Sequence, residues 1–234
     1  MSQLVFIHGP GAGSCSAGYK YQKEHFPNCL TPDLPGHPDG DSLDTVEEYT
    51  EWLHSYLHQQ GHSSDVVLSG FTLGACVALQ YALEYPDEVA GLLLMTIAMR
   101  PKERAPGSLE FRLNAAKDEK VHEEWLDAMR HSMMFIESGL REQLIECHRI
   151  VGPISQYNDL VTIDNFDVQD RISELKTPLV LVRGLDDPGK PAEYELEIHE
   201  AVTGSKYVKL DQAGHFPMAE RPDDINKLIE ELMG

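Results

Sequence analysis

The stretch GFTLG, residues 70 to 74, has the glycine spacing of a sharp strand-to-helix turn that presents a nucleophilic side chain. Such a turn usually carries serine in the middle, but this chain has Thr72. A threonine hydroxyl has the same proton chemistry as a serine hydroxyl, and a histidine can activate it. Its extra methyl group, however, hinders attack on a carbonyl and disfavours the positive φ that the turn requires. Three explanations stay open: a threonine nucleophile, a replaced serine, or a fold that binds ligands without hydrolysing them.

A carboxylate and a histidine follow two later strand-like runs. Asp186 and Asp187 lie in GLDDPGKP, residues 184 to 191, and His215 lies in a glycine-preceded turn after the run KYVKL. Ligands of open parallel sheets bind beyond the carboxyl ends of the strands, which is where these residues would lie. A hydroxyl, a histidine and a carboxylate that meet there can carry out nucleophilic catalysis.

The elements that must position these residues are short apolar runs alternating with helix-length segments. This alternation predicts an α/β fold with a mostly parallel sheet of about six strands, covered by helices on both faces. One helix is expected to begin near Ser42, as its cap, and to end at Gly61; another runs from Thr72 to Tyr85 and is stopped by Pro86. The runs expected to form strands are residues 3–7, 28–32, 65–70, 89–96, 178–184 and 206–210.

Residues 100–165 break this rhythm, because they contain no strand-like run and have the pattern of several short helices. We interpret them as a helical cap inserted into a core made of residues 1–99 and 166–234. Trp125, Met129 and Met133 in the cap either line an acyl pocket, since methionine adapts to irregular apolar shapes, or provide ordinary packing between cap and sheet.

In this order and spacing, the motifs resemble those of the α/β-hydrolases with a small helical cap. The resemblance spans nearly the whole chain, from VFIHGPGAGS through TPDLPGHPDG and GFTLG to AGHFPMAERPDDINKLIEEL. It implies Thr72 as the nucleophile, His215 as the base and Asp187 as the acid, although Asp186 stands beside it. The chain begins directly at the strand before His8, so we expect the leading antiparallel strands of the family to be missing.

The resemblance also implies two backbone amides that hold an oxyanion. Leu73 N–H is one of them. The family usually takes the other from the residue after His-Gly, but here that residue is Pro10, which has no N–H. We assign this donor to Gly11, because the additional glycine of the loop can bring its N–H to the same place. Without a second donor the rate would fall by about 100- to 1000-fold.

A dinucleotide-binding turn is the rival interpretation of the loop GPGAGS, and Asp33 lies about twenty residues beyond Gly13, where a ribose-binding acid would stand. Two features oppose it. Ser14 occupies the position of the third glycine, and His8 before the loop fits the oxyanion loop of hydrolases instead. We therefore expect no nucleotide cofactor, and no other cofactor either.

Charge and composition limit the kinds of partner that the chain can bind. The 234 residues carry a net charge of −20, which repels nucleic acid and anionic lipid surfaces. No apolar stretch is long enough to cross a bilayer, no leader-like segment begins the chain, and the four cysteines form no CxxC pair, so we expect a cytoplasmic protein with free thiols. His54, His58 and His62 are spaced like metal ligands on a helix, but no carboxylate completes an obvious site, and we expect no metal.

The sequence therefore predicts a carboxylic ester hydrolase that transfers an acyl group from a small-molecule ester to water. The acidic charge and the methionine-containing cap favour a small, uncharged and partly apolar substrate. The alternatives are a ligand-binding protein without catalysis and a family member that uses His215 and Asp187 for other proton-transfer chemistry, as C–C hydrolases and lyases do.

Overall fold

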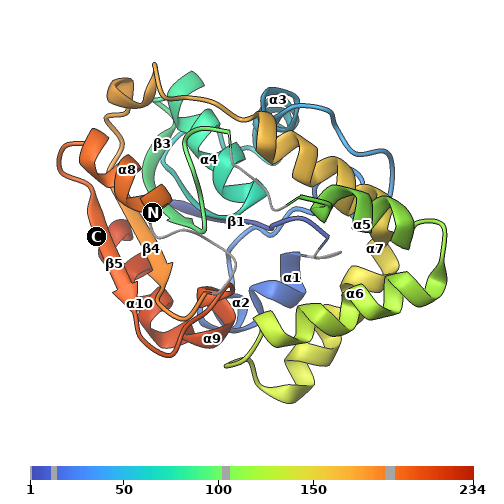
Figure 1. Cartoon of the computed structure of the whole chain (residues 1–234). Coiled ribbons are helices and arrows are strands. Elements are labelled where there is room, and N and C mark those ends of the chain that lie inside the picture. Colours follow the sequence, from blue (N-terminus) through green and yellow to red (C-terminus); the bar gives the residue numbers. More distant parts are fainter. Residues whose placement is uncertain (1, 12–14, 102–105, 188–192) are drawn as a thin grey trace.

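A computed structural model describes residues 2–11, 15–101, 106–187 and 193–234. Residues 12–14, which end the glycine-rich loop and include Gly13 and Ser14 of the dinucleotide interpretation, lie outside this part of the chain, as does the end of GLDDPGKP. Within it, a single parallel sheet has its strands in chain order (Figure 1). These strands are β1 (Gln3–Ile7), β2 (Val66–Phe71), β3 (Val89–Met95), β4 (Leu179–Gly184) and β5 (Lys206–Leu210).

The sheet thus has five strands in the described residues instead of the expected six, because residues 28–32 do not form a strand. They contribute one isolated bridge, in which Leu30 N–H donates to Leu4 O and Phe6 N–H donates to Leu30 O, each at 2.9 Å. Pro32 follows two residues later and has no N–H with which to extend the ladder. The edge of the sheet beside β1 is therefore covered by a loop with a single point of pairing.

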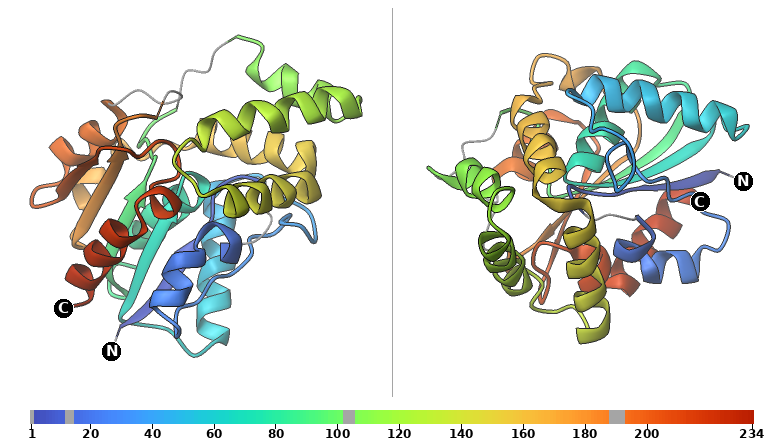
Figure 2. Two further views of the ribbon diagram at one scale, coloured as in Figure 1. Left: turned by 90° about the horizontal axis from the view of Figure 1, so that it is seen from below. Right: turned by 90° about the vertical axis from the view of Figure 1, so that its right-hand side faces the viewer.

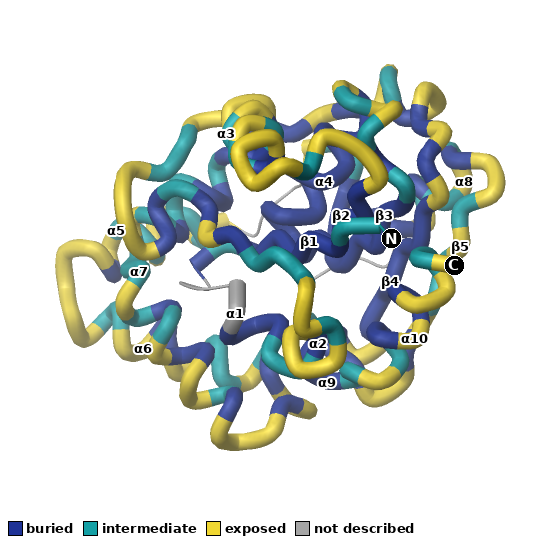
Figure 3. The backbone as a smooth tube through the Cα atoms, turned by 180° about the vertical axis from the view of Figure 1, so that it is seen from behind, coloured by how far each residue is buried: buried dark blue, intermediate teal, exposed yellow. Residues whose placement is uncertain are grey.

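Alternate residues of the strands enter two apolar clusters, one on each face of the sheet, as the two-residue period of a strand requires. Val5 and Ile7 of β1 join one cluster, and Leu4 and Phe6 join the other. Figure 3 shows β1 to β4 as the buried centre of the molecule, whereas β5 at the edge is partly exposed. The helices that pack on the first face are α3 (Val46–Gln59), α4 (Leu73–Glu84) and α8 (Glu193–Ala201). The other face is covered by α9 (Pro217–Glu220) and α10 (Pro222–Met233), with α1 (Cys15–Gly18) and α2 (Lys20–His25) beside them.

The cap of helix α3 lies three residues after Ser42, the predicted cap. Thr45 is the cap: its side chain accepts a hydrogen bond from Glu48 N–H, and the Glu48 carboxylate accepts one from Thr45 N–H. This reciprocal pair satisfies two backbone donors at the helix start, which a single Ser42 hydroxyl at that distance cannot do. The expected second helix is α4, which begins at Leu73 and is preceded by Thr72.

Three helices fill residues 108–165 and lie together on the side of the molecule away from β4 and β5 (Figure 2). They are α5 (Ser108–Ala115), α6 (Glu119–Ser132) and α7 (Ser138–Asn165). Helix α7 is kinked at Gly152, which has a φ of 81° and precedes Pro153. Its first half packs on one apolar cluster of the sheet and its second half on the other. No helix in the described part of the chain is long and apolar enough to span a membrane.

Candidate active site

Thr72 lies in the tight turn between β2 and α4, with φ 48° and ψ −107°. This positive φ agrees with the expectation from the glycine spacing of the turn, and it is a strained conformation for a β-branched residue. The turn is held by backbone hydrogen bonds from Thr72 N–H to Met95 O at 3.1 Å and from Gly74 N–H to His8 O at 3.0 Å. A Cβ on Gly74 would collide with the Ile7 carbonyl, so only glycine allows α4 to approach β1 this closely.

The Thr72 hydroxyl is buried and points at the loop that follows β1. A Cβ on Gly9 would overlap this hydroxyl, so the two groups are in direct contact. Among the described residues, Oγ1 makes no hydrogen bond, and it is therefore not bonded to His215. Because a buried hydroxyl without a partner costs free energy, the position is one at which a bound molecule could supply the missing contact.

His215 follows β5 and is oriented by Asp187, which follows β4. The His215 Nδ1 lies 2.8 Å from Asp187 Oδ2, and the Asp187 side chain is only 2% exposed. Asp186, the alternative acid, is exposed, while Asp187 is buried beside the guanidinium of Arg183, whose Nη1 lies 4.0 Å from Oδ2. The structure therefore pairs Asp187, and not Asp186, with the histidine.

His215 also adjoins the end of β2, which leads into Thr72. Its ring packs edge to face against the ring of Phe71 at 5.3 Å, and its carbonyl accepts a hydrogen bond from Thr96 Oγ1 at 3.4 Å. Thr72, Asp187 and His215 thus come from turns that all follow the carboxyl ends of strands. The structure brings Asp187 and His215 into contact and brings the residue before Thr72 against His215.

Glu220 holds the His215 turn, a role that the sequence analysis missed. Its Oε2 accepts hydrogen bonds from the N–H groups of Gly214, at 2.6 Å, and Phe216, at 3.2 Å, the two neighbours of His215. Burial raises the pKa of Glu220 above its ordinary value, and the nearby Asp187 adds to the rise. The available signal was a glutamate five residues after His215 in AGHFPMAERP. It indicates this contact only once α9 is known to return the Glu220 carboxylate to the backbone on either side of His215.

His8 fixes the loop that touches Thr72. Its Nε2 accepts a hydrogen bond from Leu34 N–H at 2.9 Å, so Nδ1 carries the proton and donates to Gly9 O at 2.7 Å. Burial, with the nearby His37, lowers the pKa of His8 to about 3, so the ring stays neutral at neutral pH. His8 therefore joins the backbones of Gly9 and Leu34 through an uncharged ring.

His148 on α7 is a second side chain that the sequence analysis missed. It is buried, and burial with the charges of His37 and His215 lowers its pKa to about 3. Its Nδ1 would lie 2.7 Å from a Cβ on Gly11, so α7 lies directly over the glycine-rich loop. Among the described residues its Nε2 has no hydrogen-bond partner, and the same holds for the amide oxygen of the neighbouring Gln156. Both are polar groups that a ligand between α7 and the loop could bind.

The two expected oxyanion donors lie on opposite sides of Thr72 in the sequence. Leu73 is the first residue of α4, so no carbonyl of its own helix accepts its N–H. Gly11 has a φ of 67° and lies against Gln156 and His148. The positive φ is compatible with the loop geometry that we expected glycine to allow, and the role of both amides stays a prediction.

The three apolar cap residues are part of the packing between helices and sheet. Trp125 and Met133 are buried within the cluster that also holds Phe71 and Phe216, and Met129 packs against it. Of the two roles that the sequence left open, this arrangement accounts for packing, and a role in an acyl pocket remains a prediction.

A buried ion pair joins α7 to the loop after residue 32. His37 Nε2 lies 2.7 Å from Asp159 Oδ2 of α7, and both side chains are fully buried. Burial lowers the pKa of His37, but the hydrogen bond and charge of Asp159 outweigh it and raise the pKa above the ordinary value. Tyr49 OH donates to the other carboxylate oxygen at 3.3 Å.

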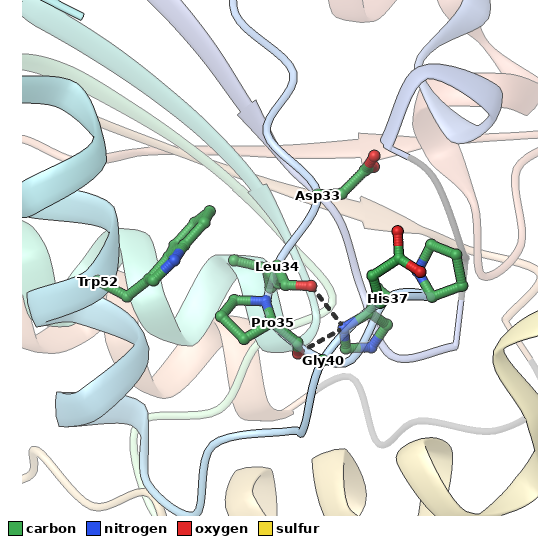
Figure 4. Close-up of a pocket in the computed structure, with 8 residues that line it drawn as sticks. Asp33, Leu34, Pro35, His37, Gly40 and Trp52 are labelled. Carbon is green, nitrogen blue, oxygen red and sulfur yellow. Dashed lines mark hydrogen bonds between the residues drawn. The ribbon is translucent and has the colours of Figure 1, made fainter. Parts of the chain in front are cut away.

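His37 also lines a pocket of about 480 Å³, shown in Figure 4, where its Nδ1 faces the carbonyl oxygens of Leu34 and Pro35. Trp52 of α3 closes one side of this pocket. The lining contains neither Thr72 nor His215, but it shares His37 with the Asp159 pair and Leu34 with the hydrogen bond to His8. The lining residues are Asp33, Leu34, Pro35, His37, Pro38, Asp39, Gly40 and Trp52.

Comparisons with known proteins agree with this architecture. The profile of a family described as "Alpha/beta hydrolase family" matches residues 4–228. A 2-hydroxy-6-oxo-6-phenylhexa-2,4-dienoate hydrolase of Comamonas testosteroni is 23% identical over 98% of this chain and 87% of its own length. A pimeloyl-[acyl-carrier protein] methyl ester esterase of Aromatoleum aromaticum is 24% identical over 98% of this chain and 97% of its own length.

Among solved structures, a thermophilic esterase from Thermogutta terrifontis is similar to this chain, with a TM-score of 0.80 and 23% identity. The match covers 99% of this chain and 89% of that structure. At this identity the likeness concerns the fold, and the chemistry has to be argued from this chain's own side chains.

Proposed function

The chain belongs to the alpha/beta hydrolase family, and from this premise we propose that it hydrolyses carboxylic esters by acyl transfer to water. The observation that carries the proposal is the 2.8 Å contact between His215 Nδ1 and the buried carboxylate of Asp187. This contact fixes the tautomer in which Nδ1 bears the proton and Nε2 offers its lone pair. An imidazole in that state is a general base for a hydroxyl group.

In the proposed mechanism, Thr72 Oγ1 attacks the ester carbonyl while His215 Nε2 takes the hydroxyl proton. The carbonyl oxygen becomes an oxyanion, which the Leu73 and Gly11 amides stabilise. His215 then gives its proton to the leaving alcohol, and an acyl-threonine is left. A water molecule then attacks this acyl-threonine while His215 Nε2 takes its proton. When the second intermediate collapses, the bond from the acyl carbon to Thr72 Oγ1 breaks, the acid is released, and His215 returns the proton to Thr72 Oγ1.

We further propose a small, uncharged and partly apolar ester as the substrate. The net charge of −20 disfavours the approach of anionic substrates. The buried and unpartnered polar atoms on α7, at His148 and Gln156, provide two points for a polar group next to an otherwise apolar surface. The name of the Aromatoleum relative, a methyl ester esterase, is consistent with an ester of a small alcohol.

A ligand-binding protein without catalysis is the second candidate, and a specific observation favours it. Thr72 Oγ1 does not hydrogen-bond to His215, and its φ of 48° is costly for a β-branched residue. A hydroxyl that its base does not activate is a poor nucleophile. In this case Thr72, Gly11 and His148 would hold a ligand without transferring an acyl group.

A panel of p-nitrophenyl esters tests both candidates with three proteins: wild type, Thr72→Ser and Thr72→Ala. Serine removes the methyl group and keeps the hydroxyl, so we expect hydrolysis to rise by about tenfold, a barrier change of about 1.4 kcal/mol. Alanine removes the hydroxyl, and only the residual catalysis of the binding site and the oxyanion hole should remain. Equal and slow hydrolysis by the serine and alanine variants would eliminate the nucleophile and leave the binding protein.

A further inference from the structure

A cluster of two histidines and a glutamate lies far from the candidate active site. His54 and His58 are one turn apart on α3, and Glu88 precedes β3. The sequence analysis set these histidines aside because no carboxylate completed a site, and the tertiary structure supplies the carboxylate of Glu88. Since Glu88 is at the amino end of β3 and Thr72 follows the carboxyl end of β2, about 20 Å of strand separates the two places.

The three side chains already have the spacing of metal ligands. The Nε2 atoms of His54 and His58 lie 3.3 Å and 3.1 Å from Glu88 Oε1, and all three ligand atoms lie within 4.8 Å of one another. Ligands of a tetrahedral zinc ion with bonds of about 2.0–2.1 Å are about 3.3–3.4 Å apart. The ion could therefore enter between these atoms with shifts of only a few tenths of an ångström at the two measured edges.

Neighbouring side chains hold two of the ligands in place. Tyr81 OH donates a hydrogen bond of 2.5 Å to Glu88 Oε2, the carboxylate oxygen that does not face the histidines. The His54 ring stacks on the ring of Tyr85 at 3.9 Å with an interplanar angle of 13°. Outer contacts of this kind orient the ligands of metal sites and increase their affinity.

Charge and access also suit a cation. Glu88 supplies a carboxylate to the site, and its Oε1 faces the Nε2 atoms of both histidines. The side chains of His58 and His54 are 40% and 27% exposed, which leaves a path for an ion from solvent. The net charge of −20 attracts cations to the surface in general.

We propose that His54, His58 and Glu88 bind one divalent transition-metal ion, for which Zn²⁺ is the best fit. Two imidazoles and one carboxylate are typical zinc ligands, and water would complete a four-coordinate site. The ion would join α3 to the segment before β3, and it would stabilise the folded chain because the ligands come together only on folding. The site takes no part in ester hydrolysis, so the proposal of a metal site does not depend on the proposed function.

Isothermal titration with zinc chloride tests this proposal on chelator-treated protein without an affinity tag. We expect the wild type to bind one Zn²⁺ per chain and to melt at a higher temperature when zinc is present. His58→Ala and Glu88→Gln each remove one ligand, and both should abolish this binding event. His62→Ala is the matched control, because His62 lies four residues beyond His58 but outside the cluster, and it should bind zinc like the wild type.

Tyr81→Phe separates an organised metal site from a simple attraction of zinc to surface histidines. It keeps all three ligands and removes only the hydrogen bond to Glu88, so the Kd should rise by about 10- to 100-fold. Circular dichroism of each variant without zinc checks that the fold is retained, and Glu88→Gln serves if His58→Ala fails to fold. Absence of zinc binding by the wild type, or binding that survives both ligand substitutions, would overturn the proposal.

Discussion

The two halves of the candidate active site differ in whether the side chain that is expected to react already has a hydrogen-bond partner. In the half that follows β4 and β5, His215 contacts Asp187, and Glu220 accepts hydrogen bonds from both neighbours of His215. In the half formed by α7 and the turn after β2, Thr72 Oγ1 and His148 Nε2 have no hydrogen-bond partner among the described residues.

This difference suggests that the two halves have different roles. The first half is organised before any ligand arrives, which is what a general base needs, since its orientation must not be created at the moment of reaction. The second half contains buried polar atoms whose desolvation is not compensated within the described chain. We infer that the first half prepares the proton transfer and that the second half awaits the contacts of a bound molecule.

His215→Ala should have the largest effect, because it removes the base from the organised half. We expect ester hydrolysis to fall by about 10²- to 10⁴-fold, the usual contribution of a positioned general base. His215 lies in a turn, so the melting temperature should change little. The control is His131→Ala, which removes an exposed histidine from α6. Activity near that of the wild type in a folded His215→Ala variant would show that hydrolysis occurs elsewhere or comes from a contaminant.

His148→Gln tests whether the unbonded half contains a neutral buried imidazole. The folded pKa of about 3 lies below the ordinary 6.5, so the unfolded chain takes up the proton first and stability is lost as the pH falls below about 6.5. Between pH 6.5 and pH 5 this costs the wild type about 1.5 kcal/mol. Urea unfolding at several pH values should show a shallower loss for His148→Gln. Identical pH dependence in the two proteins would contradict a neutral buried His148.

Glu220→Gln weakens the hydrogen bonds that hold the His215 turn but does not remove them. Its two hydrogen bonds from the neighbours of His215 become neutral, and such bonds are roughly half as strong as charge-assisted ones. We expect kcat to fall by about tenfold, which is 1.4 kcal/mol, with KM unchanged, because the substitution affects the orientation of the base and not the binding of substrate. Glu231→Gln, an exposed change beside Lys206, is the control. A change confined to KM would contradict a role in positioning His215.

Thr72→Ser should have the smallest effect on stability. The substitution relieves part of the roughly 1 to 3 kcal/mol of strain at positive φ. It also loses the burial of one methyl group, about 0.8 kcal/mol. The free energy of unfolding should therefore rise by less than about 1 kcal/mol in urea titrations. A clear decrease would mean that the methyl group of Thr72 contributes more through packing than its backbone conformation costs.

Much of the fold could be predicted from local patterns. Buried strands are short and apolar because both faces of a parallel sheet are covered, and five of the six predicted runs are strands within the described residues. The exception, residues 28–32, reads NCLTP and ends at Pro32, which has no N–H with which to extend the single bridge at Leu30 into a ladder. The positive φ of Thr72 was also predictable, because the spacing of Gly70 and Gly74 around it is typical of a sharp strand-to-helix turn whose central residue has this conformation.

The contacts of the candidate site needed the tertiary structure. The spacing from Gly184 favoured Asp187 over the neighbouring Asp186, and the structure adds the burial of Asp187 beside Arg183 and its contact with His215. His148 lies more than a hundred residues from Gly11 in the chain, and the kinked α7 brings the two together.

The sequence by itself therefore determined the alternation of strands and helices, the sharp turn at Thr72 and the order in which Thr72, Asp187 and His215 follow their strands. These depend on backbone sterics and on periodic apolar positions, which act over a few residues. Only the tertiary structure decided that Asp187 orients His215, that Glu220 holds the turn, and that Glu88 joins His54 and His58. Such contacts depend on how helices pack on the sheet, and no spacing along the chain specifies that packing.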